Sequence, residues 1–219
     1  MQKRVLITAG PVYVKIDDIR FIGNLATGRT GFLLAKEFLK AGFKVDLFIN
    51  PAGLTSGEIA FVEKNCRVIK FRWLEEFVRL AGRKCVSKYA VIVHSAAVAD
   101  YKPAKVKKGK IPSGKKTLIL KLKPAEKVIK ILRRNKKSLL VQFKLESRTT
   151  KKTLINKALL SMKKNKADMV VANLWESVEK RRFVRYIISL GTKPLKVEGA
   201  KFYKVFVQQV QTLIKERRN

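Results

Sequence analysis

The stretch "YAVIVHSA", residues 89–96, decides the fold class because it is nearly all apolar and ends in small and polar residues. A short apolar run of this kind is typical of a strand that is covered on both faces. Further strands are expected at residues 4–9, 44–49, 66–71, 138–145 and 168–173. They alternate with segments of helical spacing, so the sequence predicts an α/β protein, a three-layer Rossmann-like fold with a mainly parallel central sheet.

The helical segments are expected at residues 31–42, 73–83, 124–134, 151–165 and 201–218, the third with Pro124 in its first turn. The alternation in "KTLILKLK", residues 116–123, predicts a half-exposed strand. Residues 183–199 read as a hairpin around "GTKP", which would add a small antiparallel element. With no internal repeat and no long linker, residues 1–219 are expected to form a single domain.

The charge is extreme, with 50 Lys and Arg against 16 Asp and Glu, a formal net charge of +34. Such an excess favours polyanionic partners, and a basic nucleic-acid-binding protein is one reading. The lysines are spread over the whole chain, however, and the sequence has no RNP, KH or Cys/His finger pattern. A nucleic-acid partner therefore stays open but is not expected.

Targeting and redox features point to the cytoplasm. Gly10 and Pro11 end the first apolar run too early for a signal peptide, and no run approaches the length of a membrane span. Cys66 and Cys85 lack the short spacing of a metal site or a redox pair, so idle thiols in a reducing compartment are expected. We therefore expect a cytoplasmic protein that does not associate with membranes and has no protein-held metal site.

The loop after the first strand does not fit conventional NAD binding, because no glycine follows Gly10 until Gly23 and the GxGxxG pattern is absent. The absence of this pattern, and of a Tyr-x-x-x-Lys pair, also weighs against a nicotinamide-dependent reductase. The later part, "GNLATGRTG" at residues 23–31, precedes a helix and can present backbone N–H groups to an anion. A glycine-rich turn with an ordinary helix cap is the alternative.

Four motifs in order resemble the phosphopantothenate–cysteine ligase (phosphopantothenoylcysteine synthetase) family in its stand-alone form. They are "VLITAGPVYVKIDDIRFIGNLATGRTGFLLA" (5–35), "AAVADYKP" (96–103), "FKLES" (143–147) and "ADMVVAN" (167–173). The resemblance implies a coenzyme A biosynthesis enzyme that joins 4'-phosphopantothenate to cysteine through an acyl-nucleotide formed from CTP or ATP. It also implies Mg²⁺ with the nucleotide, no flavin, and a homodimer that uses the later antiparallel strands.

The resemblance assigns catalytic work to Asn24, Lys110 and Arg20. Asn24 would stabilise the oxyanion that forms when the amine attacks, although an Asn also commonly caps a turn. Lys110, in an expected flap at about residues 102–116, would act on phosphate, the alternative being one more solvated lysine. Arg20 would grip a phosphate or carboxylate, or would simply pair with Asp17. Substrate-binding positions implied in the first loop are Gly23, Asn24, Thr27, Gly28 and Arg29.

The resemblance also implies a nucleotide site, in which His94 is expected to line the pocket rather than act as a base. The implied positions are His94, Ser95, Ala96, Asp100, Lys110, Pro124, Ala125, Glu126, Lys127, Phe143, Lys163 and Lys164. Two departures affect the details. Pro11-Val12 replaces Gly-Thr, so one backbone N–H is missing. Ser161-Met162 stands where the family has a lysine, so a phosphate contact is expected to have moved to Lys157, Lys163 or Lys164.

Overall fold

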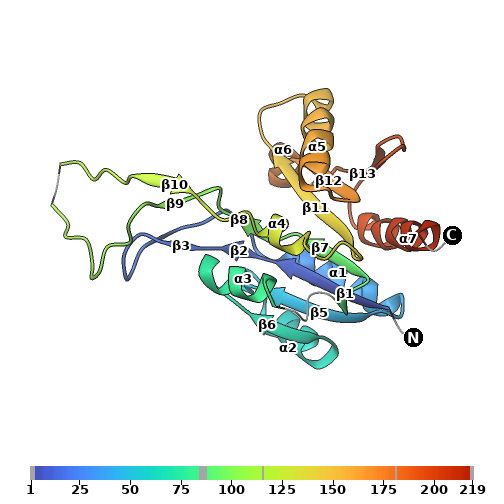
Figure 1. Ribbon diagram of the computed structural model, residues 1–219, viewed down its shortest axis with the longest axis horizontal. Helices are drawn as coiled ribbons and strands as arrows, with labels where there is room; N and C mark the ends of the chain where they lie inside the picture. Colours follow the sequence, from blue (N-terminus) through green and yellow to red (C-terminus); the bar gives the residue numbers. More distant parts are fainter. Residues whose placement is uncertain (1–2, 84–87, 115, 181, 218–219) are drawn as a thin grey trace.

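The computed structural model describes residues 3–83, 88–114, 116–180 and 182–217, and within them the central sheet has eight strands in the order β14-β13-β12-β11-β7-β1-β5-β6 (Figure 1). The parallel strands are β1 (Arg4–Ala9), β5 (Lys44–Ile49), β6 (Arg67–Lys70), β7 (Val91–His94), β11 (Leu139–Glu146) and β12 (Met169–Leu174). At one edge, β13 (Arg185–Ser189) and β14 (Leu195–Val197) run antiparallel. This confirms the predicted mainly parallel sheet and the added antiparallel element.

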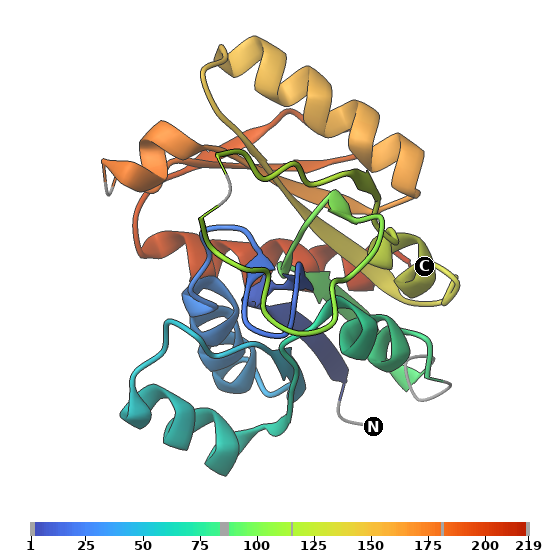
Figure 2. The same cartoon turned by 90° about the vertical axis from the view of Figure 1, so that its left-hand side faces the viewer.

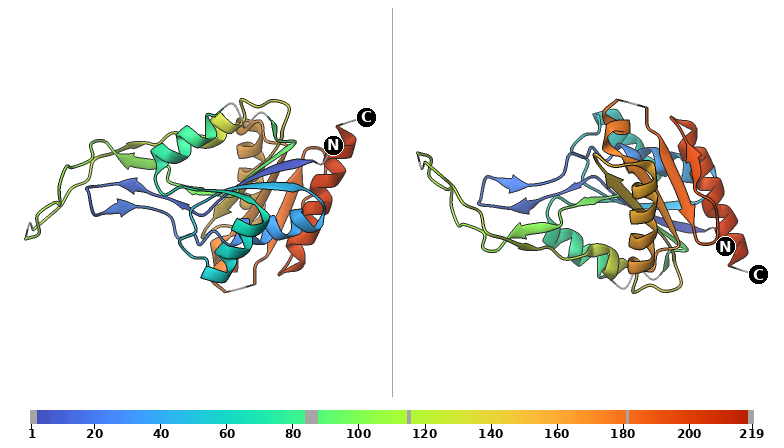
Figure 3. Two further views of the ribbon diagram at one scale, coloured as in Figure 1. Left: turned by 90° about the horizontal axis from the view of Figure 1, so that it is seen from below. Right: turned by 90° about the horizontal axis from the view of Figure 1, so that it is seen from above.

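Helices cover both faces of the sheet (Figure 3). One layer contains α1 (Arg29–Lys40), α2 (Ser56–Asn65) and α7 (Lys201–Glu216), and the other contains α3 (Leu74–Ala81), α4 (Val128–Leu132) and α5 (Lys151–Asn165). Because side chains alternate along a strand, Val5 and Ile7 pack toward the first layer and Leu6 packs toward the second. The short helix α6 (Trp175–Glu179) follows β12. These two apolar layers hold the strand ends that carry the candidate site.

Three local expectations were wrong or incomplete. Residues 116–121 are not a strand: only β10 (Leu122–Pro124) pairs, antiparallel to β9 (Tyr101–Pro103), while Ile119 is 86% exposed. Pro124 ends β10, and α4 begins four residues later, at Val128. Helix α2 is not predicted from the sequence, because Val62 is the only buried residue of this helix and its apolar pattern is weak.

Two segments project together from the carboxyl edge of the sheet and form what we call the arm, residues 13–25 and 101–122 (Figure 1). The first contains the antiparallel pair β3 (Val14–Lys15) and β4 (Phe21–Ile22), and the second contains β9 and the start of β10. Figure 2 looks onto the arm with the sheet behind it. At its base, the rings of Tyr13 and Phe21 are 4.2 Å apart. The expected flap is therefore one half of a two-part projection.

Candidate active site

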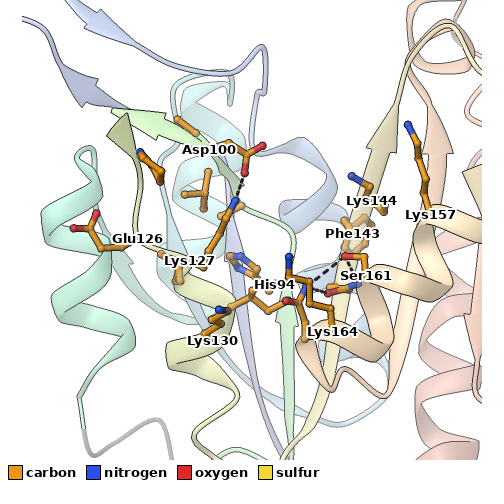
Figure 4. Close-up of a pocket in the computed structure, with 18 of the residues that line it drawn as sticks. His94, Asp100, Glu126, Lys127, Lys130, Phe143, Lys144, Lys157, Ser161 and Lys164 are labelled. Atoms are coloured by element: carbon orange, nitrogen blue, oxygen red, sulfur yellow. Dashed lines mark hydrogen bonds and ion pairs between the residues drawn. The ribbon is translucent and has the colours of Figure 1, made fainter. Parts of the chain in front are cut away.

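A cleft of about 770 Å³ opens at the carboxyl ends of β7 and β11, between α4 and α5 (Figure 4). Predicted nucleotide-binding residues from both halves of the chain line it: His94, Ala96, Asp100, Pro124, Glu126, Lys127, Phe143 and Lys164. Ser95 and Ala125 are chain neighbours of lining residues but do not themselves line the cleft. Neither Lys163 nor Lys110 lines it. The structure thus gathers most of this predicted set around one cleft.

Lysines dominate the charge of the cleft. Lys130 lies in α4, and Lys127 directly precedes this helix. Lys144 lies in β11, and Lys157 and Lys164 lie in α5. In Figure 4 these side chains lie on opposite sides of the opening. These five lysines outnumber the three carboxylates that also line the cleft, Asp100, Glu126 and Glu146. A cleft with an excess of positive charge attracts a polyanion such as a triphosphate.

The carboxylates of the cleft are already paired with lysines. Glu146 receives Lys144 Nζ at 2.7 Å and Lys157 Nζ at 2.6 Å, and these two bonds lower the pKa of the Glu146 carboxyl. Asp100 pairs with Lys127. Lys130 and Lys164 form no ion pair with any residue in the described ranges. These two lysines can therefore bind an incoming anion without first breaking an ion pair.

His94 forms part of the cleft wall as a neutral side chain. Its Nδ1 lies 2.8 Å from Thr8 Oγ1, and its ring stacks on Phe77 with 6.0 Å between centroids. Burial lowers the pKa of His94 to about 4, so the imidazole carries no charge at neutral pH. Such a group can donate or accept one hydrogen bond toward the cleft but is a weak base. This agrees with a lining role.

The loops after β1 and β7 are joined to each other beside the cleft. Thr8 O accepts from Ser95 N at 2.9 Å and from Ser95 Oγ at 2.8 Å, and β2 (Pro11–Val12) pairs in parallel with β8 (Ala97–Val98). Gly10 makes the turn possible: its φ is +86°, and a Cβ there would lie 2.1 Å from the backbone oxygen of Asn50. The first loop is therefore held directly next to the cleft.

Helix α1 begins in that first loop. Thr27 Oγ1 accepts from Arg29 N at 3.3 Å, and no other side chain of the described residues accepts from the N–H groups of the first turn, so the rest of this N-terminus is open. Its N-cap, Gly28, has φ +82° and no side chain that could cap the helix, and the first turn has no acidic residue. The N–H groups of the first turn and the helix dipole favour an anion here. Gly23, Asn24 and Thr27, in the loop before the helix, are exposed, whereas Arg29 pairs with Glu58 of α2 at 3.1 Å. Four of the five predicted substrate-binding positions thus lie in the loop that leads into this helix.

The arm is held together by one buried carboxylate. Asp17, 1% exposed, accepts from Ile111 N at 3.0 Å, from Ile19 N at 2.9 Å and from Arg20 N at 2.6 Å. The bond from Ile111 is the main reason that the pKa of Asp17 lies below its ordinary value. Arg20 donates to Asp17 Oδ2 and to the carbonyl of Ile111, both at 3.2 Å. The guanidinium of Arg20 thus joins the two segments of the arm in this structure, in agreement with the alternative that Arg20 pairs with Asp17.

Lys110 lies between two anchored peptides of the arm. Asp18 Oδ2 accepts from Gly109 N at 2.8 Å, and Asp17 Oδ2 accepts from Ile111 N. Lys107 N also donates to Ile16 O at 2.9 Å. The backbone on both sides of Lys110 is therefore tied to the β3–β4 hairpin, while its side chain is exposed. Both segments of the arm would have to move together to bring Lys110 to the cleft.

Sequence reasoning missed several residues that line the cleft. Lys130, Gln142, Lys144, Glu146 and Asn165 do so, and none was singled out. A helical count would have found part of α5: residues 157, 160, 161, 164 and 165 share the face that lines the cleft, while Leu154, Ala158 and Met162 form the buried stripe. Lys163 lies on neither face. Of the three lysines considered for the moved phosphate contact, Lys157 and Lys164 line the cleft.

Other classes of site find little support in the described ranges. They contain no group of three or more His, Cys, Asp or Glu side chains that could hold a metal ion. No helix there is both long enough and apolar enough to cross a bilayer. Burial raises the pKa of the Cys66 thiol to about 11, so it is protonated and unreactive at neutral pH. Cys85 lies outside the described residues.

Comparison with known proteins decides the family. Residues 1–185 match the family model of the DNA/pantothenate metabolism flavoprotein C-terminal domain. The chain belongs to this family. The coenzyme A biosynthesis bifunctional protein CoaBC of Borreliella burgdorferi is 33% identical over 174 residues, 78% of this chain and 42% of that protein. CoaBC of Methanocaldococcus jannaschii is 36% identical over 172 residues, 78% of this chain and 40% of that protein. The chain thus spans about two fifths of these relatives.

Two solved structures share the fold. The DNA/pantothenate metabolism flavoprotein of Streptococcus pneumoniae superposes with a TM-score of 0.83 at 23% identity, covering 96% of this chain and 99% of that one. A mutant of Cab2 in complex with phosphopantothenate-cysteine gives 0.78 at 19% identity, covering 98% and 87%. At these identities the likeness establishes the fold alone.

Proposed function

We propose that this chain is a phosphopantothenate–cysteine ligase, which joins 4'-phosphopantothenate to cysteine at the expense of CTP or ATP. The observation that carries the proposal is the position of the lysine-lined cleft next to the loop after β1, which the β2–β8 pair holds there and whose Gly10 lies against Gly28, the N-cap of α1. One region suits a nucleoside triphosphate and the other an anionic acid. The Cab2 complex, whose ligand is phosphopantothenate-cysteine, belongs to a protein of the same fold.

The first step makes an acyl-nucleotide. A carboxylate oxygen of 4'-phosphopantothenate attacks the α-phosphorus, the bond from that phosphorus to the β-phosphate oxygen breaks, and pyrophosphate leaves. The transition state is more anionic at the transferred phosphoryl group, so fixed cations stabilise it. Lys130 and Lys164, which have no carboxylate partner among the described residues, are placed to bind the triphosphate in the cleft. Lys110 would add its charge to the attacked phosphate once the arm approaches.

The second step makes the amide. The cysteine amine attacks the acyl carbon, the acyl–oxygen bond to phosphate breaks, the nucleoside monophosphate leaves and the amine loses a proton. The side-chain amide of Asn24, exposed in the loop before α1, would donate to the oxyanion of the tetrahedral intermediate. Because His94 is neutral and bound to Thr8, we assign it no proton transfer.

Magnesium fits the cleft as a companion of the nucleotide. The described residues provide no metal cage, and Asp100 and Glu146, which line the cleft, pair with lysines. Phosphates and water would therefore supply most of the ligands, and either carboxylate would join them by exchanging a lysine partner for the ion. When bound, Mg²⁺ neutralises charge on the pyrophosphate leaving group.

A homodimer is part of the same proposal, with the arm as the contact. Exposed large apolar side chains gather there: Ile19, Phe21, Leu25, Tyr101, Val106, Leu118, Ile119, Leu120 and Leu122. The β13–β14 hairpin, named from the resemblance, exposes Leu190 and Leu195. Ile119→Lys should lower the mass measured by light scattering to that of a monomer, while Leu190→Lys should leave a dimer. The reverse result would indicate that the β13–β14 hairpin, and not the arm, forms the dimer interface.

The activity is tested by following the product. Purified protein with 4'-phosphopantothenate, cysteine, Mg²⁺ and either CTP or ATP should form 4'-phosphopantothenoylcysteine, detected by mass spectrometry. With Asn24→Asp, the acyl-nucleotide should accumulate and amide formation should fall about 100-fold, as expected for loss of an oxyanion donor. No product with either nucleotide would overturn the proposal, and undiminished turnover by Asn24→Asp would remove the role of Asn24.

A further inference from the structure

Three uncharged polar side chains form a connected group in the wall of the cleft. Gln142 Nε2 donates to Ser161 Oγ at 3.2 Å. Asn165 Nδ2 donates to Gln142 Oε1 at 2.8 Å and lies 3.4 Å from Ser161 Oγ. All three line the cleft, and Gln142 is only 3% exposed. We call these residues the polar trio.

The polar trio replaces apolar packing at the place where the sheet meets the cleft. Along β11, Leu140 belongs to the apolar layer under α5, and Gln142 is the next residue on the same face. In α5, Ser161 and Asn165 lie on the cleft side of the buried stripe. Burying an amide costs free energy unless its hydrogen bonds are made. The polar trio therefore either binds a polar ligand in the cleft or serves only to join α5 to β11.

The charges around the polar trio separate the cleft into two chemical regions. Lys157 and Lys164 flank Ser161 on α5, and Lys144 follows Gln142 on β11. Across the sheet, the register partner of Gln142 is His94, which is also neutral. The wall made by Gln142, Ser161, Asn165 and His94 thus bears no charge, while cations surround it.

We propose that the polar trio recognises the nucleoside part of the nucleotide, its base and ribose, while the surrounding lysines bind the phosphates. A nucleoside is uncharged at neutral pH and presents both donors and acceptors, whereas a triphosphate presents acceptors and negative charge. Ser161 Oγ accepts from the two amides, and its hydrogen has no acceptor among the residues that the structure describes, so it can donate to a ligand, while Asn165 Oδ1 is an acceptor. The polar trio therefore offers both a donor and an acceptor to a base or ribose, and it carries no positive charge of its own for a phosphate. The inference rests on the proposed function only for the identity of the ligand as a nucleotide.

A comparison of two probes tests this assignment. We would measure binding of CTP, ATP and inorganic tripolyphosphate by isothermal titration calorimetry. Ser161→Ala should lower the affinity for the preferred nucleotide about threefold to tenfold, as expected for one lost hydrogen bond. The affinity for tripolyphosphate should stay within about twofold of the wild-type value. Gln142→Met should weaken the nucleotide more. Lys164→Gln is the matched control from the same helix face, and it should weaken both probes by a similar factor.

Two outcomes would overturn the inference: equal weakening of nucleotide and tripolyphosphate by Ser161→Ala, or no weakening of either. In both cases the polar trio would only tie α5 to β11. If Gln142→Met fails to fold, Ser161→Ala still decides, because it removes one oxygen from a half-buried position. The measurement uses neither 4'-phosphopantothenate nor cysteine. A failed ligation assay would therefore leave the binding result standing, and the two failures can be told apart.

Discussion

The cleft and the arm carry residues that we assign to one reaction, yet they are built in different ways. The cleft follows from the sheet: its residues stand where buried parallel strands end and where α4 and α5 face each other. The arm has little core of its own, and backbone hydrogen bonds to Asp17 and Asp18 join its two segments. We propose that the cleft is a preformed binding site and the arm a movable catalytic element, and these two have different structural requirements. The cleft needs rigid neighbours, whereas the arm needs a few bonds that fix its shape.

The largest effect on stability should come from the packing of α1 on β1, on the sheet face opposite α4 and α5. At Gly31, a Cβ would lie 2.2 Å from Ala9 Cβ, where α1 rests on β1. Gly31→Ala should cost about 1–3 kcal/mol of unfolding free energy in urea titrations, the usual range for overpacking. Gly57→Ala in α2 is the control, since no atom would lie within 4 Å of a Cβ at that position, and it should not destabilise the protein. Equal effects would mean that α1 and β1 are not in close contact.

A smaller and more local effect is expected in the arm. Asp17→Asn removes the charge that accepts from Ile111, Ile19 and Arg20. Trypsin cleavage between Lys105 and Lys110 should become about tenfold faster, since hydrogen bonds to a charged group are worth more than neutral ones. The urea midpoint of the whole protein should shift much less than with Gly31→Ala. Asp18→Asn, an exposed position that accepts from Gly109, should accelerate cleavage less. Unchanged cleavage in Asp17→Asn would show that the two segments are held by other contacts.

The smallest effect is an absence of titration in the cleft. His94 is the only histidine of the sequence, so its ring gives a single set of NMR signals. Because burial lowers its pKa to about 4, these signals should stay constant from pH 8 to pH 5.5. Since the unfolded chain binds this proton near pH 6.5, stability should fall as the pH drops from 6.5 toward 4. A midpoint near 6.5 in the folded protein would place the ring in solvent.

The same contrast explains what the sequence could predict. Apolar runs such as residues 89–96 located the central strands, and the strand ends then located His94, Ala96 and Phe143 at the cleft. The alternation in residues 116–123 predicts a strand, but Leu118 and Ile119 belong to the exposed arm. Alternation alone cannot tell which surface covers an apolar side chain. The bonds that Asp17 and Asp18 make to residues 109–111 span more than 90 positions, a distance over which local pattern carries no information.

The central claim is that the cleft binds the nucleotide and the arm acts on it, and Lys110 tests this most directly. We would measure CTP and ATP affinity by calorimetry and pyrophosphate release in the presence of 4'-phosphopantothenate, for Lys110→Gln and for Lys107→Gln, a neighbouring exposed lysine of the arm. Lys110→Gln should slow pyrophosphate release about 100-fold, in the range for loss of one charge-stabilising group, with affinity changed by less than about threefold. Lys107→Gln should stay near wild type in both. Equal slowing by the two variants, or a loss of affinity as large as the loss of rate, would contradict the claim.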